Sequence, residues 1–167
     1  MNVGDKVILF SDRCETYIIY LLVLWEMGCI VIPLGINTPN GRLQAVIEEC
    51  ELQALVVIQN DNVTVKYYED NARDESLLDC AYILFTSGSS GKPKGAVISR
   101  HALDVFVRDS LEATQYSALK YKSVLATASF SFDMHLIEVL LALVNHQSLI
   151  LAADNEVSNP RKIAKLI

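Results

Sequence analysis

Between two apolar segments the chain reads Phe85-Thr86-Ser87-Gly88-Ser89-Ser90-Gly91-Lys92-Pro93-Lys94-Gly95. The flanking segments, residues 81–84 and 96–98, are apolar and are expected to be strands. Glycines remove the Cβ atoms that keep a ligand away from backbone N–H groups, and they permit positive φ values. Hydroxyls and lysines supply the donors and the positive charge that phosphate oxygens accept. The stretch therefore predicts an anion-binding loop.

A plain turn and a Walker A loop are the two alternatives for this stretch. Clusters of glycine, serine and proline between strands are commonly plain turns or flexible linkers. Lys92 and Lys94, with Pro93 stiffening the segment between them, argue against an inert linker. A Walker A loop needs Gly-x-x-x-x-Gly-Lys-Ser/Thr leading into a helix. Here Gly88 and Gly91 are three residues apart and a strand-like segment follows, so that motif is excluded.

Length and composition indicate a folded protein of the cytoplasm. The 167 residues are 51% hydrophobic, which suits one domain or part of a larger one and excludes disorder. A formal net charge of −6 argues against a nucleic-acid partner, which needs a basic face. Residues 1–5 lack a signal-peptide pattern, and the apolar run 16–25 is shorter than the roughly 20 residues that span a bilayer. No membrane partner is expected.

The cysteines and histidines show no metal-binding pattern. Cys14, Cys29, Cys50 and Cys80 are scattered, without a Cys-x-x-Cys pair or a histidine at zinc-ligand spacing. We expect four free thiols, buried or half-buried, as is typical of a reducing compartment. The three histidines are interpreted as structural or exposed rather than catalytic. No metal site is predicted.

Strand-like and helix-like segments alternate along the chain. The expected strands are residues 6–10, 29–34, 54–58, 81–84, 96–99, 123–127 and 148–152, and the expected helices are residues 13–27, 38–50, 101–116, 133–145 and 160–167. The polar, acidic stretch 59–79 is interpreted as a surface excursion without assigned function. This alternation predicts an α/β fold with an open, mainly parallel sheet and helices on both faces.

Capping signals predict the ends of the first two helices. Asp12, with Glu15 three residues later, forms a box-like pattern at the start of the first helix, and Gly28 is placed to end it. Thr38 would cap the second helix, with Pro39 in its first turn.

The opening stretch also carries a family resemblance. Residues 82–95, Y-I-L-F-T-S-G-S-S-G-K-P-K-G, resemble the signature loop of the adenylate-forming enzymes: acyl-CoA synthetases, luciferases and the amino-acid adenylation domains of nonribosomal peptide synthetases. Other segments match in the family's order, namely V-G-D-K-V at 3–7, M-G-C-I-V-I-P-L at 27–34, Thr38-Pro39, Arg42-Leu43, F-S-F-D at 130–133, Glu138 and Ala142-Leu143. One departure is Gly35-Ile36, where peptide synthetases usually have Asp-Pro.

The resemblance implies a reaction and its cofactors. A carboxylate attacks the α-phosphate of MgATP to give an acyl-adenylate and pyrophosphate, and the acyl group then passes to a thiol such as the phosphopantetheine of a carrier protein. The carrier protein and the remaining synthetase modules are the implied partners. Such transfers depend on positioning and charge neutralisation. The implied ATP/pyrophosphate loop comprises the β,γ-phosphate-binding hydroxyls and lysines and the shaping glycines: Thr86, Ser87, Gly88, Ser89, Ser90, Gly91, Lys92, Lys94 and Gly95.

Asp133 has two interpretations. An aspartate just before Met134 is a good helix N-cap, worth about 1 kcal/mol. In amino-acid-activating members of the family, the aspartate of the Phe-Asp motif holds the substrate's α-ammonium group, and activators of fatty and aryl acids generally lack it. The resemblance therefore implies an amino-acid substrate, because a buried ammonium needs a paired charge. Met134 and Ile137 would line its side-chain pocket, and His135 stands where many relatives have a small hydroxyl residue.

The resemblance further implies a partial domain, cut at both ends. Family members carry an adenine- and Mg²⁺-contacting loop, a ribose-binding aspartate, a hinge and a catalytic lysine in segments that would follow Ile167. Residues 1–167 are expected to form part of the N-terminal AMP-binding domain, with sub-regions 1–58, 59–79 and 80–167, without a complete catalytic set and inactive alone. Two alternatives stay open: an acyl-CoA-synthetase-like enzyme for acids without an amino group, and a non-catalytic binding module.

Overall fold

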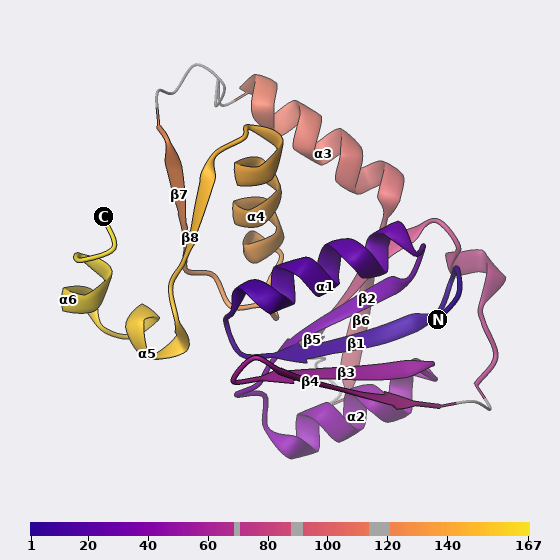
Figure 1. Ribbon diagram of the computed structural model, residues 1–167. Helices are drawn as coiled ribbons and strands as arrows, with labels where there is room; N and C mark the ends of the chain where they lie inside the picture. The colour runs from indigo at the N-terminus through magenta and orange to yellow at the C-terminus, as the bar shows by residue number, and fades with distance from the viewer. Residues whose placement is uncertain (69–70, 88–91, 114–120) are drawn as a thin grey trace.

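A six-stranded sheet forms the larger part of the fold (Figure 1). The computed structural model describes residues 1–68, 71–87, 92–113 and 121–167. The strands are β1 (Lys6–Ser11), β2 (Ile30–Gly35), β3 (Ala54–Gln59), β4 (Asn62–Tyr67), β5 (Cys80–Ser87) and β6 (Pro93–Ser99), in the order β4-β3-β1-β2-β5-β6. The four central strands are parallel, and the two edge strands are antiparallel to their neighbours. The predicted open, mainly parallel sheet is confirmed.

A helix covers each face of this sheet, as predicted. Figure 1 shows α1 (Glu15–Glu26) on one face and α2 (Asn40–Cys50) on the other. Alternate residues of β1 divide between the two cores, since Val7 and Leu9 cluster with the buried side of α1, whereas Ile8 and Phe10 cluster with that of α2. Every residue of β1 is buried. A strand covered on both faces is a continuous apolar run in the sequence.

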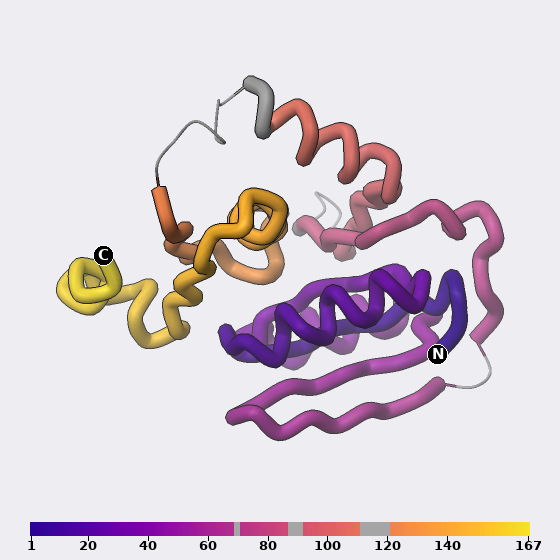
Figure 2. Tube along the Cα trace, turned by 45° about the horizontal axis from the view of Figure 1, so that its top comes forward, coloured from indigo at the N-terminus to yellow at the C-terminus, as the bar shows by residue number. Residues whose placement is uncertain are grey.

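A second, two-stranded parallel sheet accompanies the first. Its strands, β7 (Ser123–Ala126) and β8 (Ser148–Leu151), are connected through α4 (Met134–Val144). Helix α3 (Arg100–Ala113) follows β6, and the short helices α5 (Asp154–Val157) and α6 (Pro160–Ile163) follow β8. Figures 1 and 2 both place this unit beside the beginning of α1. Strands 123–127 and 148–152 were expected within one sheet, and the structure assigns them to a separate one.

Arg13 connects the two sheets. Its Nε donates to the Ala152 carbonyl at 2.6 Å, and its terminal nitrogens donate to the carbonyls of Ala126, at 2.8 Å, and of Ala128. These acceptors lie at or just beyond the ends of β7 and β8. The guanidinium carbon lies 5.2 Å from the centre of the Phe130 ring. A planar fork of five N–H donors can hold several carbonyls at once in a fixed geometry.

Helix α1 ends as predicted but begins differently. Gly28 follows its last turn with φ +76°, a conformation that strongly favours glycine. At the start, Cys14 is the N-cap residue, and no side chain makes a capping hydrogen bond. The Asp12 carboxylate instead accepts from the Asn60 N–H at 3.0 Å. The predicted capping box is therefore wrong, because Asp12 lies two residues before the N-cap and binds the turn after β3.

Helix α2 also begins without the predicted cap. Pro39 rather than Thr38 occupies the N-cap position, and no side-chain capping bond forms there. The Pro39 carbonyl accepts from the N–H groups of Arg42 and Leu43, at 2.9 and 3.0 Å. The helix therefore starts one residue later than Thr38 would have placed it.

The polar stretch 59–79 contains an edge strand that was not predicted. β4 pairs antiparallel with β3 along its whole length, from Ala54 opposite Tyr67 to Gln59 opposite Asn62. The two residues between the strands, Asn60 and Asp61, have φ values of 50° and 60°. Asparagine and aspartate tolerate such values in two-residue hairpin turns. The surface-excursion interpretation is thus wrong for residues 62–67. Strands from all three sub-regions, 1–58, 59–79 and 80–167, share one sheet.

The four cysteines are free thiols, as predicted, with Cys14 half-buried and the others buried. Burial raises the pKa of Cys50 to about 12 and that of Cys80 to about 11. Both thiols therefore stay protonated at neutral pH and pack as small apolar groups. Within residues 1–68, 71–87, 92–113 and 121–167, no helix is both long and apolar enough to cross a membrane.

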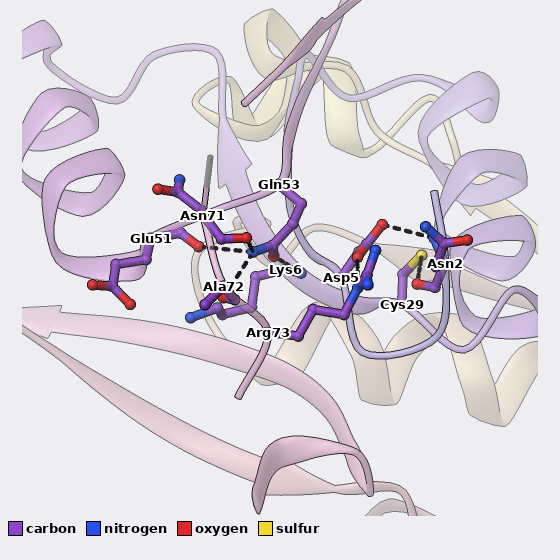
Figure 3. A network of polar contacts seen from close by, with 9 residues as sticks. All are labelled: Asn2, Asp5, Lys6, Cys29, Glu51, Gln53, Asn71, Ala72 and Arg73. Atoms are coloured by element: carbon purple, nitrogen blue, oxygen red, sulfur yellow. Dashed lines mark hydrogen bonds and ion pairs between the residues drawn. The ribbon is translucent and has the colours of Figure 1, made fainter. Parts of the chain in front are cut away.

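Gln53 is at the centre of a polar network beside the start of β1 (Figure 3). Its Oε1 accepts from the Lys6 N–H at 2.7 Å. Its Nε2 donates to the carbonyls of Glu51, Asn71 and Ala72, at 3.1–3.2 Å. Gln53 is 8% exposed, so each of these bonds replaces a water contact that folding has removed. The network holds residues 71–72 close to β3.

Gln53→Ala is expected to lower the free energy of unfolding by about 2 kcal/mol, because the buried Lys6 N–H loses its acceptor. Arg108→Ala is the comparison, since its ion pair with Asp104 is exposed on both sides. We expect that change to cost at most about 1 kcal/mol. Urea denaturation of both variants measures the difference. Equal losses would contradict the central role of Gln53.

Candidate functional site

The predicted phosphate loop is the connection of a β-hairpin. β5 and β6 pair antiparallel from Cys80 opposite Ser99 to Ser87 opposite Pro93. The predicted strands 81–84 and 96–99 are therefore too short, and Thr86, Lys94 and Gly95 lie in strands rather than in a loop. Exposed Lys92 immediately precedes β6. Gly88, Ser89, Ser90 and Gly91 lie outside the described residues.

One face of the hairpin changes from apolar to polar toward the loop. The cross-strand pairs on this face are Tyr82–Ile98, Leu84–Ala96 and Thr86–Lys94. Both apolar pairs and Thr86 line one cavity of about 360 Å³. Because side chains alternate along a strand, Lys94 leaves the backbone on the same side as Ala96. Thr86 thus lines the loop end of this cavity, and the Lys94 side chain leaves the same face of the hairpin without lining the cavity.

Gly95 belongs to the opposite face of the hairpin. A Cβ atom there would lie 2.8 Å from Cγ2 of Ile83 and 3.1 Å from Cζ of Phe85. Glycine is therefore required by close packing against these two side chains. The expectation that Gly95 shapes a mobile loop is wrong, because the residue is inside a strand.

Two cavities adjoin at Asp133. The first, of about 260 Å³, lies between the hairpin and helices α3 and α4 and is lined mainly by apolar side chains, among them Phe106 and Ile137. The second is the 360 Å³ cavity along the hairpin, which extends to Arg42. Asp133, together with Tyr82 and Ile98 of the hairpin, lines both. A carboxylate therefore stands where an apolar cavity meets a more polar one.

The Asp133 carboxylate is not used as a helix cap. The residue occupies the N-cap position of α4, with φ −60° and ψ −33°, but its side chain makes no capping hydrogen bond. Its negative charge, second to burial, raises the pKa of the nearby Tyr82. The side chain is exposed. The carboxylate is thus free of the competing structural role that its sequence position suggested.

The two residues expected to line a substrate pocket are placed differently. Ile137 lines the 260 Å³ cavity. Met134 is 51% exposed, and the residues lining the two cavities do not include it. Residues three or four apart lie on the same face of a helix. Leu136 and Ile137 follow Asp133 at these spacings, so they lie on its side of α4 and line the same cavity.

Arg42 and Glu138 are further charged residues that sequence reasoning did not assign to a site. Arg42 donates to the Phe85 carbonyl at 2.7 Å and lines the cavity along the hairpin. The Glu138 carboxylate accepts from the N–H groups of Thr127 and Ala128, at 3.1–3.4 Å. Both belong to segments that match the family, which was the only available signal. With Thr86 and Lys94, the Arg42 guanidinium makes the hairpin end suitable for a phosphate group.

His135 is buried beneath the Asp133 turn. Its Nε2 lies 2.8 Å from the Tyr17 hydroxyl, and its Nδ1 bonds the Phe132 carbonyl. Because a carbonyl can only accept, Nδ1 carries the proton and Nε2 accepts from the hydroxyl. Burial lowers the pKa of His135 to about 4. The ring is therefore neutral at pH 7 and serves a structural role, as the sequence suggested.

The stability of the protein is expected to fall as pH drops from about 6.5, the ordinary pKa of histidine, to about 4. The unfolded state binds the His135 proton more tightly, so this contribution is fully present above 6.5 and is lost toward the folded-state pKa. The shift corresponds to about 3 kcal/mol. Denaturation of the parent and of His135→Asn at pH 7, 5.5 and 4 measures it. Identical pH dependence in both proteins would contradict the assignment.

The doubly covered parallel sheet, the hairpin with its Ser/Gly/Lys connection and the adjoining cavities define part of an adenylate-forming protein. The family described as AMP-binding enzyme matches residues 58–167, and the chain belongs to this family. Within it, the chain resembles the N-terminal part of the adenylation domains of nonribosomal peptide synthetases.

Individual relatives agree with this assignment. The hybrid PKS-NRPS synthetase xenE of Xenoacremonium sinensis is 30% identical over 98% of this chain, which covers 4% of that protein. The N-(5-amino-5-carboxypentanoyl)-L-cysteinyl-D-valine synthase of Penicillium rubens is 27% identical over 93% of this chain, which covers 5% of it. The chain thus spans about a twentieth of their length. Among solved structures, holo-AB3403, a four-domain nonribosomal peptide synthetase bound to AMP and glycine, superposes with TM-score 0.80 at 23% identity, over 99% of this chain and 13% of that one.

Proposed function

We propose that this region takes part in the ATP-dependent activation of an amino acid. The main support is the Asp133 carboxylate, which lines both cavities and makes no capping bond. In this arrangement the apolar cavity receives the amino-acid side chain and Asp133 pairs with the α-ammonium group. An ammonium taken out of water needs such a partner. The substrate carboxylate then extends along the hairpin face toward Thr86.

The proposed reaction transfers the adenylyl group. An oxygen of the substrate carboxylate bonds to the α-phosphorus of ATP, the bond from that phosphorus to the bridging oxygen breaks, and pyrophosphate leaves. Mg²⁺, when bound with ATP, neutralises phosphate charge. We assign the stabilisation of pyrophosphate to Thr86, Lys92 and Lys94 with the neighbouring residues 87–91, because developing charge is best stabilised by fixed donors and cations. Transfer to the phosphopantetheine thiol of a carrier protein is the proposed next step.

We further infer that residues 1–167 alone do not complete this reaction. The resemblance assigns the ribose-binding aspartate and the catalytic lysine to segments other than those matched here. Adenylation depends on all reacting groups being positioned together, so a partial site loses most of the rate. The isolated chain is expected to show no ATP–pyrophosphate exchange. Exchange by the isolated chain would contradict this inference.

ATP–pyrophosphate exchange in the full-length protein that contains this chain tests the proposed function. A panel of amino acids is compared with the matching acids that lack the amino group. Exchange with one or a few amino acids, and none with their deaminated counterparts, is the expected result. The reverse pattern would establish the alternative, an acyl-CoA-synthetase-like activation of simple acids. Calorimetric binding of ATP without any exchange would instead indicate a non-catalytic binding module.

A further inference from the structure

We propose that His135 is a positioning residue, which holds the turn that carries Asp133 at the meeting point of the two cavities. The inference rests on the proposed amino-acid substrate. It concerns a residue that does not line either cavity. Its effect on substrate binding would be exerted through the Phe132 carbonyl and the backbone of Asp133.

Hydrogen bonds fix the backbone at the start of α4. The N–H groups of Leu136 and Ile137 both donate to the Asp133 carbonyl, at 2.9 and 3.3 Å. The preceding carbonyl, that of Phe132, is bonded by the His135 Nδ1–H. Backbone polar groups at the start of a helix that have no partner within the helix normally bond to side chains or water. The imidazole thus adds a side-chain hydrogen bond to the peptide group that joins Phe132 to Asp133.

The imidazole is itself held by a residue of α1. The Tyr17 hydroxyl donates to Nε2 at 2.8 Å, across 118 residues of sequence. Tyr17 is fully buried on α1, and its ring stacks on Phe130 with centroids 3.7 Å apart and an interplanar angle of 13°. His135 itself is 1% exposed. The position of the turn is therefore fixed by contacts with α1 and the core of the main sheet as well as by its own helix.

Both ring nitrogens of His135 are used, so the residue type matters. The two ring nitrogens point in different directions, so a neutral imidazole can donate to the Phe132 carbonyl and accept from Tyr17 at once. An aliphatic side chain of similar size would fill the space without either bond. An asparagine would retain a donor near the position of Nδ1. The Asp133 carboxylate, two residues away, would therefore keep its position with asparagine at residue 135 and lose it with an aliphatic side chain.

Three variants of the full-length protein separate positioning from general stability. His135→Leu removes both bonds, and His135→Asn keeps the donor to Phe132. Val139→Ala is the matched control, because Val139 is 1% exposed on the same helix and lines neither cavity. All are compared at the same interval below their melting temperatures. The KM values for the amino acid and for ATP are measured in ATP–pyrophosphate exchange, with amide hydrogen exchange of residues 132–137 as a second readout.

We expect His135→Leu to raise the amino-acid KM by roughly tenfold or more without changing the ATP KM, because misplacing a binding group by about 1 Å weakens it strongly. His135→Asn should restore most of this loss, and Val139→Ala should leave both constants unchanged. An unchanged amino-acid KM in His135→Leu, an equal rise in both constants, or the same effect in Val139→Ala would overturn the proposal.

A failure of the proposed function can be distinguished from a failure of the positioning role of His135. If the parent protein activates no amino acid, that function is wrong, and amide exchange then decides the structural claim alone. Faster exchange of residues 132–137 in His135→Leu than in both His135→Asn and Val139→Ala would support positioning of the turn. Equal exchange in the three variants would overturn it.

Discussion

Asp133→Asn is expected to raise the amino-acid KM in ATP–pyrophosphate exchange by roughly a hundredfold, while the ATP KM stays nearly constant. Removing one member of a desolvated charge pair costs about 2–5 kcal/mol, and each 1.4 kcal/mol is a factor of ten. Asparagine has nearly the same shape as aspartate, so the two cavities that adjoin at this residue keep their walls. The change therefore tests charge rather than packing.

The control for this prediction is Asp104→Asn on α3. Asp104 forms an exposed ion pair with Arg108 one turn away, and such pairs contribute little. Its exchange kinetics should match those of the parent. An amino-acid KM that is unchanged in Asp133→Asn would remove this carboxylate from the binding site.

Lys94→Met is expected to lower the rate of exchange by roughly a hundred- to a thousandfold, with a smaller effect on the amino-acid KM. The Lys94 side chain leaves β6 on the face of Ala96 and Ile98, which line the cavity along the hairpin. At its loop end, an ammonium can neutralise the charge that develops on departing pyrophosphate. Methionine keeps the length of the side chain and removes only the charge.

Lys66→Met provides the comparison for Lys94. Lys66 is exposed on the edge strand β4, where its Nζ lies 4.8 Å from the centre of the Tyr68 ring, and it lies away from both cavities. Its variant should exchange at the parent rate. A Lys94→Met rate within about threefold of the parent would contradict the electrostatic role, since removal of one such group normally costs more than tenfold.

Much of the fold was readable from local patterns. The apolar runs at 6–10 and 29–34 indicated strands, and Gly28 marked the end of α1 because the chain there needs a positive φ. The structure places both strands inside the sheet, where their two faces are buried. Edge strands were harder to predict. β4 exposes most of its side chains, so its sequence is polar and was read as an excursion.

The extent of the hairpin was also underestimated. The glycine and serine residues suggested a long loop from Phe85 to Gly95, but cross-strand pairing continues to Ser87 and Pro93. Gly95 illustrates the reason, since its glycine is required by the neighbouring Ile83 and Phe85 side chains rather than by a turn. The sequence shows that residue 95 is small, but only the packing of the folded protein shows which neighbouring side chains require a glycine there.

The sequence by itself determined the α/β class, the family and the two chemically distinctive segments, because these depend on residues adjacent in the chain. Only the tertiary structure decided that the Asp133 side chain makes no capping bond, that Arg42 contacts the end of β5, and that Tyr17 bonds His135. The physical reason is that local patterns specify backbone conformation and buried faces. Which distant side chains meet depends on strand order and on the packing of helices across the sheet.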